Sequence, residues 1–238
     1  MTGKDARARK AARLGVRPIG TVRRILLVDC DQFFVQCARL ADPEGAGREP
    51  LLLVGGSPER RGVVTSASYE TRKYGARSGM PMARALRLCP QAKVVPVPRE
   101  LCGIKSREVR AVLARFSPVV EAASIDEAYL DMTGTEALYD DAPLEEVARR
   151  IQAAVREETG IAVSLGGGTN RLIAKLASGL AKPAGVHVVP AGEEAAFMRR
   201  FTLRDLPGVG PALADTLQRL GLATVEHALE RDEAWMIR

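Results

Sequence analysis

The chain has 238 residues, which is enough to bury a hydrophobic core and to form a small number of domains. Its composition, with 46% hydrophobic and 27% charged residues, is typical of a soluble globular protein. No run reaches the roughly 20 apolar residues of a membrane span, and no signal peptide precedes the first expected strand. We therefore expect a cytoplasmic protein that does not enter a membrane.

The four cysteines, Cys30, Cys37, Cys89 and Cys102, form no Cys-x-x-Cys pair, and the chain has only two histidines. Structural zinc sites and disulfide frameworks usually need several closely spaced Cys or His residues. We therefore expect reduced thiols rather than a zinc centre or a set of disulfides.

The net charge of +6 is distributed unevenly along the chain. Residues 1–24 carry +7 and residues 60–115 carry +10, whereas residues 25–59 carry −4 and residues 116–238 carry −7. Two basic blocks among acidic ones suit a protein that grips a polyanion beside a metal-binding centre. Basic blocks can equally be solvated surfaces, and charge alone leaves both interpretations open.

Several expected elements follow one another in the first half of the chain. Residues 1–20 are rich in Arg, Lys and Ala and lack an apolar stripe, which indicates a flexible basic arm. A buried strand at residues 25–28 ends in Asp29 and Asp31, which alternate and therefore share one face. The pattern then predicts strands at 50–56 and 61–68, helical segments at 69–76 and 81–89, and an extended piece at 92–98.

The second half mixes hairpins with longer helices. Residues 100–116 have the apolar spacing of an amphipathic helix, and residues 119–132 read as paired strands with a turn near 121–124. A helix is expected at 143–159, where Pro143 lies near its start and Gly160 follows its end. A strand at 161–168, a helix at 170–183 and short elements up to residue 229 complete the chain. This mixture predicts an α+β fold with helices packed on a mixed sheet.

The stretch SIDEAYLD places Asp126 and Glu127 side by side in an otherwise apolar strand. Two adjacent carboxylates are costly there, because each loses water and the two repel. With Asp29 they would suit two divalent ions, since Mg²⁺ prefers hard oxygen ligands. Neighbours on a flat strand face opposite sides, so we expect a turn or bulge if both acids reach metal. The alternative, that one acid is a cap or a surface group, stays open on spacing alone.

The stretch TSASYETRKYG brings together groups that suit phosphate oxygens. Tyr69 and Arg72 share a helix face, Ser66 precedes them, and Arg is a forked donor. Lys175 is a basic residue on a helix that also carries apolar side chains. Its alternative role is a lysine whose stem covers apolar surface while its head stays in water.

Two glycine-rich runs need different interpretations. The run SLGGGTNRL lacks the Gly-Lys-Ser/Thr ending of a nucleotide phosphate loop. In LPGVG, the residues Gly208, Val209 and Gly210 form a Gly-x-Gly hairpin whose backbone N–H groups suit a DNA phosphate. A tight turn between helices is the structural alternative.

Five motifs occur together and in register: LVDCDQFF, TSASYETRKYG, SIDEAYLD, NRLIAKLASGLAKPAG and LPGVG. Over residues 24–238 the chain thereby resembles the Y-family DNA polymerases, most closely the DNA polymerase IV branch. The resemblance implies a palm at residues 23–32 and 99–185, small α/β fingers at 33–98, and a partial helix-hairpin-helix thumb at 186–238. The flexible arm at 1–22 would precede them.

The resemblance also implies an activity and roles for individual residues. The activity is translesion-type DNA synthesis, in which dNMP passes from dNTP to a primer 3′-hydroxyl with low processivity and without proofreading. Asp29, Asp126 and Glu127 would hold two Mg²⁺ ions, or Mn²⁺ in their place, with the Cys30 carbonyl as a further ligand. The dNTP contacts would be Tyr69, Arg72, Lys175 and Ser66 on the triphosphate, Phe34 as the steric gate against a ribose 2′-hydroxyl, and Phe33 along the sugar pocket.

Some positions depart from the family pattern. Ser66 stands where threonine is common, and Cys30 and Gln32 are unusual around the acids. Gly167 stands where an apolar residue is usual, so we expect a looser strand end before Lys175. Asp31 is no metal ligand in the family, and we expect a structural role for it.

The family's thumb continues beyond Arg238 and a DNA-gripping little-finger domain follows it, and neither lies in this sequence. Outside residues 1–24 the net charge is −1, so we expect weak, salt-dependent binding of template through residues 60–115, the hairpin and the arm. The expected partners are primer–template DNA and dNTP, with a sliding clamp bound through a C-terminal region beyond Arg238. We expect a monomer.

Two other functions were weighed against DNA synthesis. A polymerase-like accessory protein would bind DNA or partners without synthesis, but such relatives lose the metal carboxylates, and all three stand here. Nucleotide cyclisation would keep the two-metal chemistry, but the hairpin and the KPAG segment argue against it. Incorporation of dNTP into a primer separates the three.

Overall fold

The computed structural model describes residues 22–232, so most of the expected basic arm lies outside the described residues. The described chain divides into two compact units, one from residues 22–27, 129–149 and 165–232, the other from residues 28–128 and 150–164. We call them the C-terminal unit and the central unit. Their boundaries differ from those of the expected palm, fingers and thumb, which remain predictions.

A five-stranded sheet contributes strands to both units and has the order β5-β6-β1-β7-β8. β1 and β7 are buried along their whole length, as their apolar and glycine-rich sequences predict. β7 and β8 are parallel, with Leu165 opposite Val186. The strands are β1 (Ile25–Cys30), β5 (Val120–Ala122), β6 (Glu127–Asp131), β7 (Val163–Gly168) and β8 (Val186–Val188).

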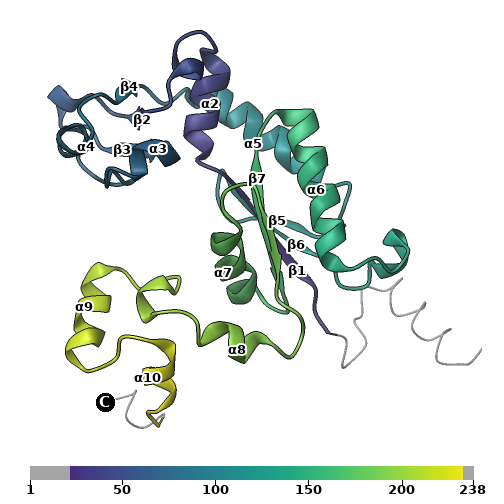
Figure 1. The fold of residues 1–238 in the computed structure, drawn as a ribbon. Coiled ribbons are helices and arrows are strands. Elements are labelled where there is room, and N and C mark those ends of the chain that lie inside the picture. The colour runs from purple at the N-terminus through teal and green to yellow at the C-terminus, as the bar shows by residue number, and fades with distance from the viewer. Residues whose placement is uncertain (1–21, 233–238) are drawn as a thin grey trace, which may run out of the picture. The chain divides into compact units, whose positions relative to one another are not determined.

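A second, three-stranded sheet lies within the central unit (Figure 1). Its middle strand β2 (Leu52–Gly55) pairs antiparallel with β3 (Val64–Ala67) and parallel with β4 (Lys93–Val95). The helices around it are α2 (Phe33–Ala41), α3 (Tyr69–Arg72) and α4 (Met82–Leu88). Buried Leu53, Val64 and Met82 share one core cluster, which fixes α4 on this sheet.

The three longest of the described helices are α5 (Arg99–Leu113), α6 (Leu144–Thr159) and α7 (Arg171–Ala181). α6 ends where Gly160 adopts a positive φ of 72°, a conformation that favours glycine. α7 begins at Asn170, whose side-chain oxygen accepts the N–H of Ile173 at 3.0 Å. The expected end of α6 and the expected start of α7 are therefore confirmed by recognisable caps, whereas α5 ends three residues earlier than expected.

The C-terminal unit builds a core between α7 and the helices that follow it. Ile173 and Leu176 of α7 join Phe197, Phe201 and other buried residues in one cluster. The remaining helices are α8 (Glu194–Met198), α9 (Pro211–Arg219) and α10 (Val225–Leu229), with a short 3₁₀ helix at Leu203–Asp205.

The expected α+β fold with mixed sheets is confirmed. Several boundaries differ from expectation; in particular, α3 spans only four residues, and the turn between β5 and β6 lies at residues 123–126 rather than near 121–124. α3 is short because Gly75 takes a positive φ of 93° soon after Arg72. None of the helices at residues 22–232 is both long and apolar enough to cross a bilayer.

The cysteines lie in the interior as free thiols, Cys30, Cys37, Cys89 and Cys102. Burial raises the pKa of Cys37, Cys89 and Cys102 above the ordinary thiol value. These three thiols therefore stay protonated at neutral pH, and a protonated thiol is a poor nucleophile and metal ligand.

The glycines of β7 permit close packing. A Cβ on Gly167 would lie 2.9 Å from Val188 Cγ2 and 3.0 Å from Leu26 Cδ2. The expected looseness at Gly167 is therefore wrong, because neighbouring side chains fill the space that an apolar side chain would take. Gly166 is tighter still, since its Cβ would lie 2.1 Å from both the carbonyl oxygen of Ala174 and the amide nitrogen of Ser178 in α7.

Replacing Gly166 with alanine should therefore push α7 away from β7. We expect Gly166→Ala to lower the free energy of unfolding by about 1–3 kcal/mol or more, since backbone atoms cannot yield as a flexible side chain can. Gly179→Ala, in the helix α7 that Gly166 contacts, is the control, because nothing lies within 4 Å of its added Cβ. It should raise the free energy of unfolding by about 0.5–1 kcal/mol through helix propensity. Urea denaturation of both variants measures the free energy of unfolding. Equal changes in Gly166→Ala and Gly179→Ala would contradict the packing argument.

Candidate active site

The three acids expected to bind metal all lie in the central unit, at the ends of neighbouring strands. Asp29 is next to last in β1 and is 6% exposed. Asp126 and Glu127 stand where β6 begins, and both are partly buried. The N–H of Cys30 donates to the carbonyl of Asp126 at 2.9 Å, so the two chain segments lie side by side. Residues about a hundred positions apart in sequence are thus brought together.

The expected bend at the acid pair is confirmed. Residues 123–126 leave the strand geometry, and the N–H groups of Ala123 and Ser124 both donate to the carbonyl of Glu127, at 2.9 and 3.2 Å. Asp126 therefore belongs to a tight turn and Glu127 to the strand after it. The alternation of a flat strand does not apply across this pair, so the two side chains need not face opposite sides.

The donor chemistry at this turn suits a hard divalent cation, because three carboxylates and the Cys30 carbonyl offer oxygen ligands. Asp126 Oδ1 accepts a hydrogen bond from Ser124 Oγ at 2.6 Å. Across residues 22–232, no group of three or more His, Cys, Asp or Glu side chains is arranged to hold a metal ion. The two-ion site therefore remains a prediction, and binding would require Asp126 to exchange its Ser124 contact for a cation.

Asp31 has the structural surroundings that we expected. It is 3% exposed, and its carboxylate accepts from the hydroxyl of Tyr69 at 2.8 Å and from Ser164 Oγ at 2.9 Å. Its own N–H donates to the carbonyl of Ala162 at 3.0 Å. A buried carboxylate is tolerated when it is hydrogen-bonded in this way. Asp31 thereby ties the end of β1 to α3 and to β7.

Tyr69 and Arg72 form one polar face, as their helical spacing predicts. The Arg72 guanidinium lies 5.0 Å from the centre of the Tyr69 ring, and its Nε donates to the carbonyl of Ala67 at 3.0 Å. Burial, and then the hydrogen bond to Asp31, raise the pKa of Tyr69 well above the usual range. The phenol is therefore neutral at physiological pH, and its hydrogen is donated to Asp31. Ser66 lies buried on β3 in the same unit.

Phe34 and Phe33 begin α2 but have different surroundings. Phe33 is 1% exposed and belongs to the core, whereas Phe34 is partly buried against a cluster that includes Val35 and Leu52. The two rings meet edge to face, with centroids 5.5 Å apart. Phe34 thus has the more accessible ring of the two, and Phe33 can support it from behind.

Sequence reasoning missed the two glutamines that fix this region. Gln32 adopts the left-handed conformation at φ 39°, and its side-chain oxygen accepts the N–H of Tyr69 at 2.9 Å. Gln36 donates to the carbonyl of Ala162 at 2.9 Å and accepts its N–H at 2.7 Å. Gln32 departs from the family pattern, but its partner Tyr69 is 37 residues away in sequence, so the contact itself leaves no local signal.

The other predicted residues lie in the C-terminal unit. Lys175 is partly buried on α7, and both interpretations of its role remain open. In the hairpin, Gly208 has a positive φ of 91°, and the N–H of Val209 already donates to the carbonyl of Leu206 at 3.0 Å. Of the three predicted amide donors, Val209 is therefore occupied within the turn. The contacts of Lys175 with triphosphate and of the hairpin with DNA remain predictions.

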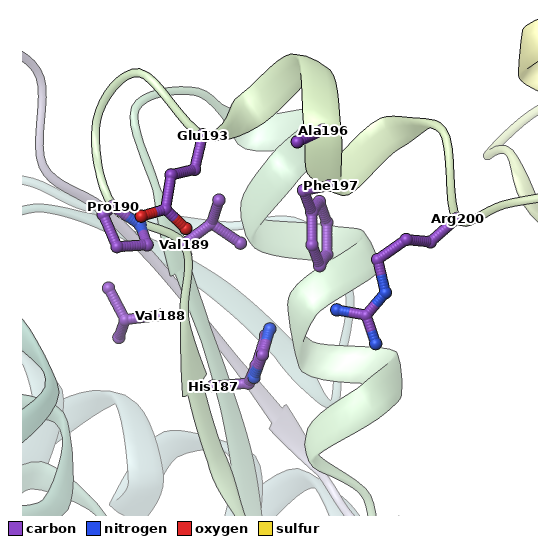
Figure 2. A pocket seen from close by; sticks show the side chains of 8 residues that line it. All are labelled: His187, Val188, Val189, Pro190, Glu193, Ala196, Phe197 and Arg200. Carbon is purple, nitrogen blue, oxygen red and sulfur yellow. The ribbon is translucent and has the colours of Figure 1, made fainter.

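A pocket of about 230 Å³ opens between β8 and α8 (Figure 2). Its lining includes His187, Glu193, Phe197 and Arg200. His187 stacks on Phe197 with ring centroids 5.7 Å apart, and the Arg200 guanidinium lies 5.9 Å from the Phe197 ring centre. The residues predicted from sequence do not line this pocket, and its aromatic ring is already covered by its neighbours.

Comparison with characterised sequences places this geometry in context. The DNA polymerase IV of Dehalococcoides mccartyi (strain CBDB1) is 40% identical over 205 residues, which are 86% of this chain and 52% of the relative. The DNA polymerase IV of Halorhodospira halophila (strain DSM 244 / SL1) is 41% identical over 210 residues, which are 88% of this chain and 58% of the relative. The chain thus spans between half and three fifths of the length of these relatives.

Solved structures agree with the sequence relatives. DinB from Sulfolobus solfataricus superposes with a TM-score of 0.80 at 30% identity, covering 90% of this chain and 62% of that one. The insertion ternary complex of Dbh DNA polymerase gives a TM-score of 0.79, also at 30% identity, with the same coverage of both chains. The profile of the impB/mucB/samB family matches residues 28–179, which contain the turn with Asp126 and Glu127. The chain therefore belongs to the impB/mucB/samB family, and with it to the Y-family of DNA polymerases that its motifs resemble.

Proposed function

We propose that this chain is the catalytic core of a translesion-type, template-directed DNA polymerase. The observation that carries the proposal is the hydrogen bond from the Cys30 N–H to the Asp126 carbonyl, which pairs the strand that carries Asp29 with the turn before Glu127. The relatives named DNA polymerase IV support the same reaction. In that reaction a primer 3′-hydroxyl attacks the α-phosphate of a dNTP, and pyrophosphate leaves.

Asp29, Asp126, Glu127 and the Cys30 carbonyl would hold two Mg²⁺ ions, with Mn²⁺ as a substitute. Such ions activate an attacking oxygen and offset the charge on the leaving group. The protein's own contribution would be positional, because β1 and the turn fix the main chain that carries the carboxylates. Charges held in place in this way lower the barrier.

Tyr69, Arg72, Ser66 and Lys175 would hold the triphosphate. Arg72 is the natural forked donor for phosphate oxygens. Tyr69 carries one hydroxyl hydrogen, and that hydrogen is donated to Asp31. For Tyr69 to donate to triphosphate, the hydrogen must turn away from Asp31, which would then rely on Ser164 and on other donors.

Phe34 would select against ribonucleotides, and the DNA would be gripped through phosphates. A ring beside C2′ of the sugar leaves no room for a hydroxyl, which makes Phe34, as the more accessible of the two rings, the better gate. The basic block at residues 60–115 and the amides of Gly208 and Gly210 would contact the backbone of primer–template DNA. Contacts of this type give salt-dependent binding without base preference, which agrees with low processivity.

The first test is primer extension with Mg²⁺ at low salt. We expect Asp126→Ala to lower the extension rate by at least about a hundredfold, because it removes a charge aimed at the reacting groups. Glu157→Ala removes a carboxylate from the exposed face of α6 and should leave the rate unchanged. Equal rates for wild type and Asp126→Ala would rule out this acid as a metal ligand. Binding of DNA without extension by either protein would favour an accessory role.

Phe34→Ala should open the sugar pocket. We expect the preference for dNTP over rNTP, measured as the ratio of kcat/KM values, to fall at least about tenfold, since the pocket loses the bulk that excludes a hydroxyl. Phe34→Tyr keeps the ring and should keep the preference. An unchanged preference in Phe34→Ala would show that the gate lies elsewhere.

Tyr69→Phe separates the two possible partners of the phenol. If the hydroxyl donates to triphosphate during binding, KM for dNTP should rise by roughly three- to tenfold, as expected for one lost hydrogen bond. Tyr74→Phe, at an exposed tyrosine near the same helix, serves as the control. Because the pKa of Tyr69 is raised, its hydroxyl keeps its proton from pH 7 to pH 9, and the effect of the variant should not change over that range. An unchanged KM would assign the hydroxyl to Asp31 alone.

A further inference from the structure

Ser106 is a buried hydroxyl on a helix face that otherwise packs apolar groups. It is 3% exposed and lies on α5 one and two turns before Val109 and Leu113, which are also buried. A hydroxyl at such a position is costly unless it is hydrogen-bonded. Ser106 Oγ donates to the carbonyl of Ile125 at 2.6 Å. The hydroxyl therefore bonds to a residue 19 positions away in sequence and not to a carbonyl of its own helix.

The acceptor of this bond lies inside the turn that carries the acid pair. Ile125 directly precedes Asp126, and its apolar side chain is 42% exposed. Burial of that side chain therefore anchors the turn only weakly, and the main chain must be held by polar contacts. Ser106, Val109 and Leu113 line a narrow cavity together with Cys30 and residues 124–128, which places the hydroxyl beneath the turn.

Backbone-to-backbone bonds restrain the ends of the turn, and inside it the N–H of Asp126 makes a long bond to Ser124 Oγ, at 3.3 Å. Ala123 and Ser124 donate to the Glu127 carbonyl, and Cys30 donates to the Asp126 carbonyl. The Ser106 bond adds a restraint on the carbonyl of Ile125, between these two sets. Since one peptide unit joins the Ile125 carbonyl to the nitrogen of Asp126, a fixed carbonyl limits how Asp126 can rotate.

We propose that Ser106 is a positioning residue for the acid pair: its hydroxyl holds the Ile125 carbonyl, so that Asp126 and Glu127 are both presented to the reacting groups. The inference rests on the proposed polymerase function for its catalytic consequence. Ser106 itself touches neither substrate nor metal. It acts through the main chain, from a helix that the five motifs of the family do not include.

The experiment compares three variants of the full chain: Ser106→Ala, Ser106→Thr and Ser117→Ala. Ser117 is the matched control, because it is also 3% exposed in the same unit and also donates its hydroxyl to a backbone carbonyl, that of Val119, at 3.1 Å. Primer extension gives kcat and KM for dNTP. Amide hydrogen exchange at Cys30, Ala123 and Ser124 reports the turn without any need for activity.

In Ser106→Ala, we expect kcat to fall by roughly tenfold to a hundredfold, because small misplacements of reacting groups cost rates of that order. KM for dNTP should stay within about twofold, since the triphosphate contacts are untouched. Exchange at the three amides should become at least about fivefold faster, as the turn opens more often. Ser106→Thr keeps a hydroxyl and should restore kcat and protection, and Ser117→Ala should match wild type.

The inference would be overturned if Ser106→Ala had the kcat and the amide exchange rates of wild type. It would also be overturned if Ser117→Ala lowered kcat as much as Ser106→Ala does. A fall of kcat in Ser106→Ala that Ser106→Thr does not restore would overturn it as well, because the packing of the side chain rather than its hydroxyl would then determine the rate. If wild type extends no primer while Ser106→Ala still opens the turn, the proposed function fails and the positioning of the acids stands.

Discussion

The central unit depends on one buried carboxylate. Asp31 is almost fully removed from water, and a carboxylate in that position requires donors. It receives them from Tyr69 and Ser164, which come from different parts of the chain. Three segments must therefore meet for the charge to be tolerated. Asp29 lies only two residues earlier, near the end of β1, so the network that satisfies Asp31 also helps to set where the candidate metal ligand stands.

Asp126 and Glu127 lose less of their hydration than Asp31 does, so their charges are less costly. Asp126 and Glu127 are only partly buried and lie at the start of a strand, where water can still reach them. Their mutual repulsion is smaller in such surroundings than it would be in the core. A cation bound at this partly exposed acid pair, as the proposed function requires, would not have to be completely desolvated first. The hydroxyl of Ser124 donates to the Asp126 carboxylate itself, at 2.6 Å.

Much of the fold could be predicted from local patterns. The strand at residues 25–28 and the helices at 143–159 and 170–183 have unambiguous periodicity and caps, and they formed as expected. The length of α3 was overestimated because the helical spacing continues past the glycine that ends it. The acid pair and its turn could be predicted because two adjacent charges in an apolar stretch demand an explanation. Their partners could not, since hydrogen bonds such as that from Ser106 to Ile125 join side chains to backbone atoms of no particular sequence.

Gln36 illustrates a further consequence of such long-range bonds. Its amide both donates to and accepts from Ala162, so it imitates the pairing of a neighbouring strand residue at the point where β7 begins. A shift of β7 by one residue would turn Ser164 to the other face of the sheet, away from Asp31. It would also break both bonds to Gln36. Gln36 thus favours a single register of β7, because a misaligned strand would lose both bonds to Gln36 as well as the bond from Ser164 to Asp31.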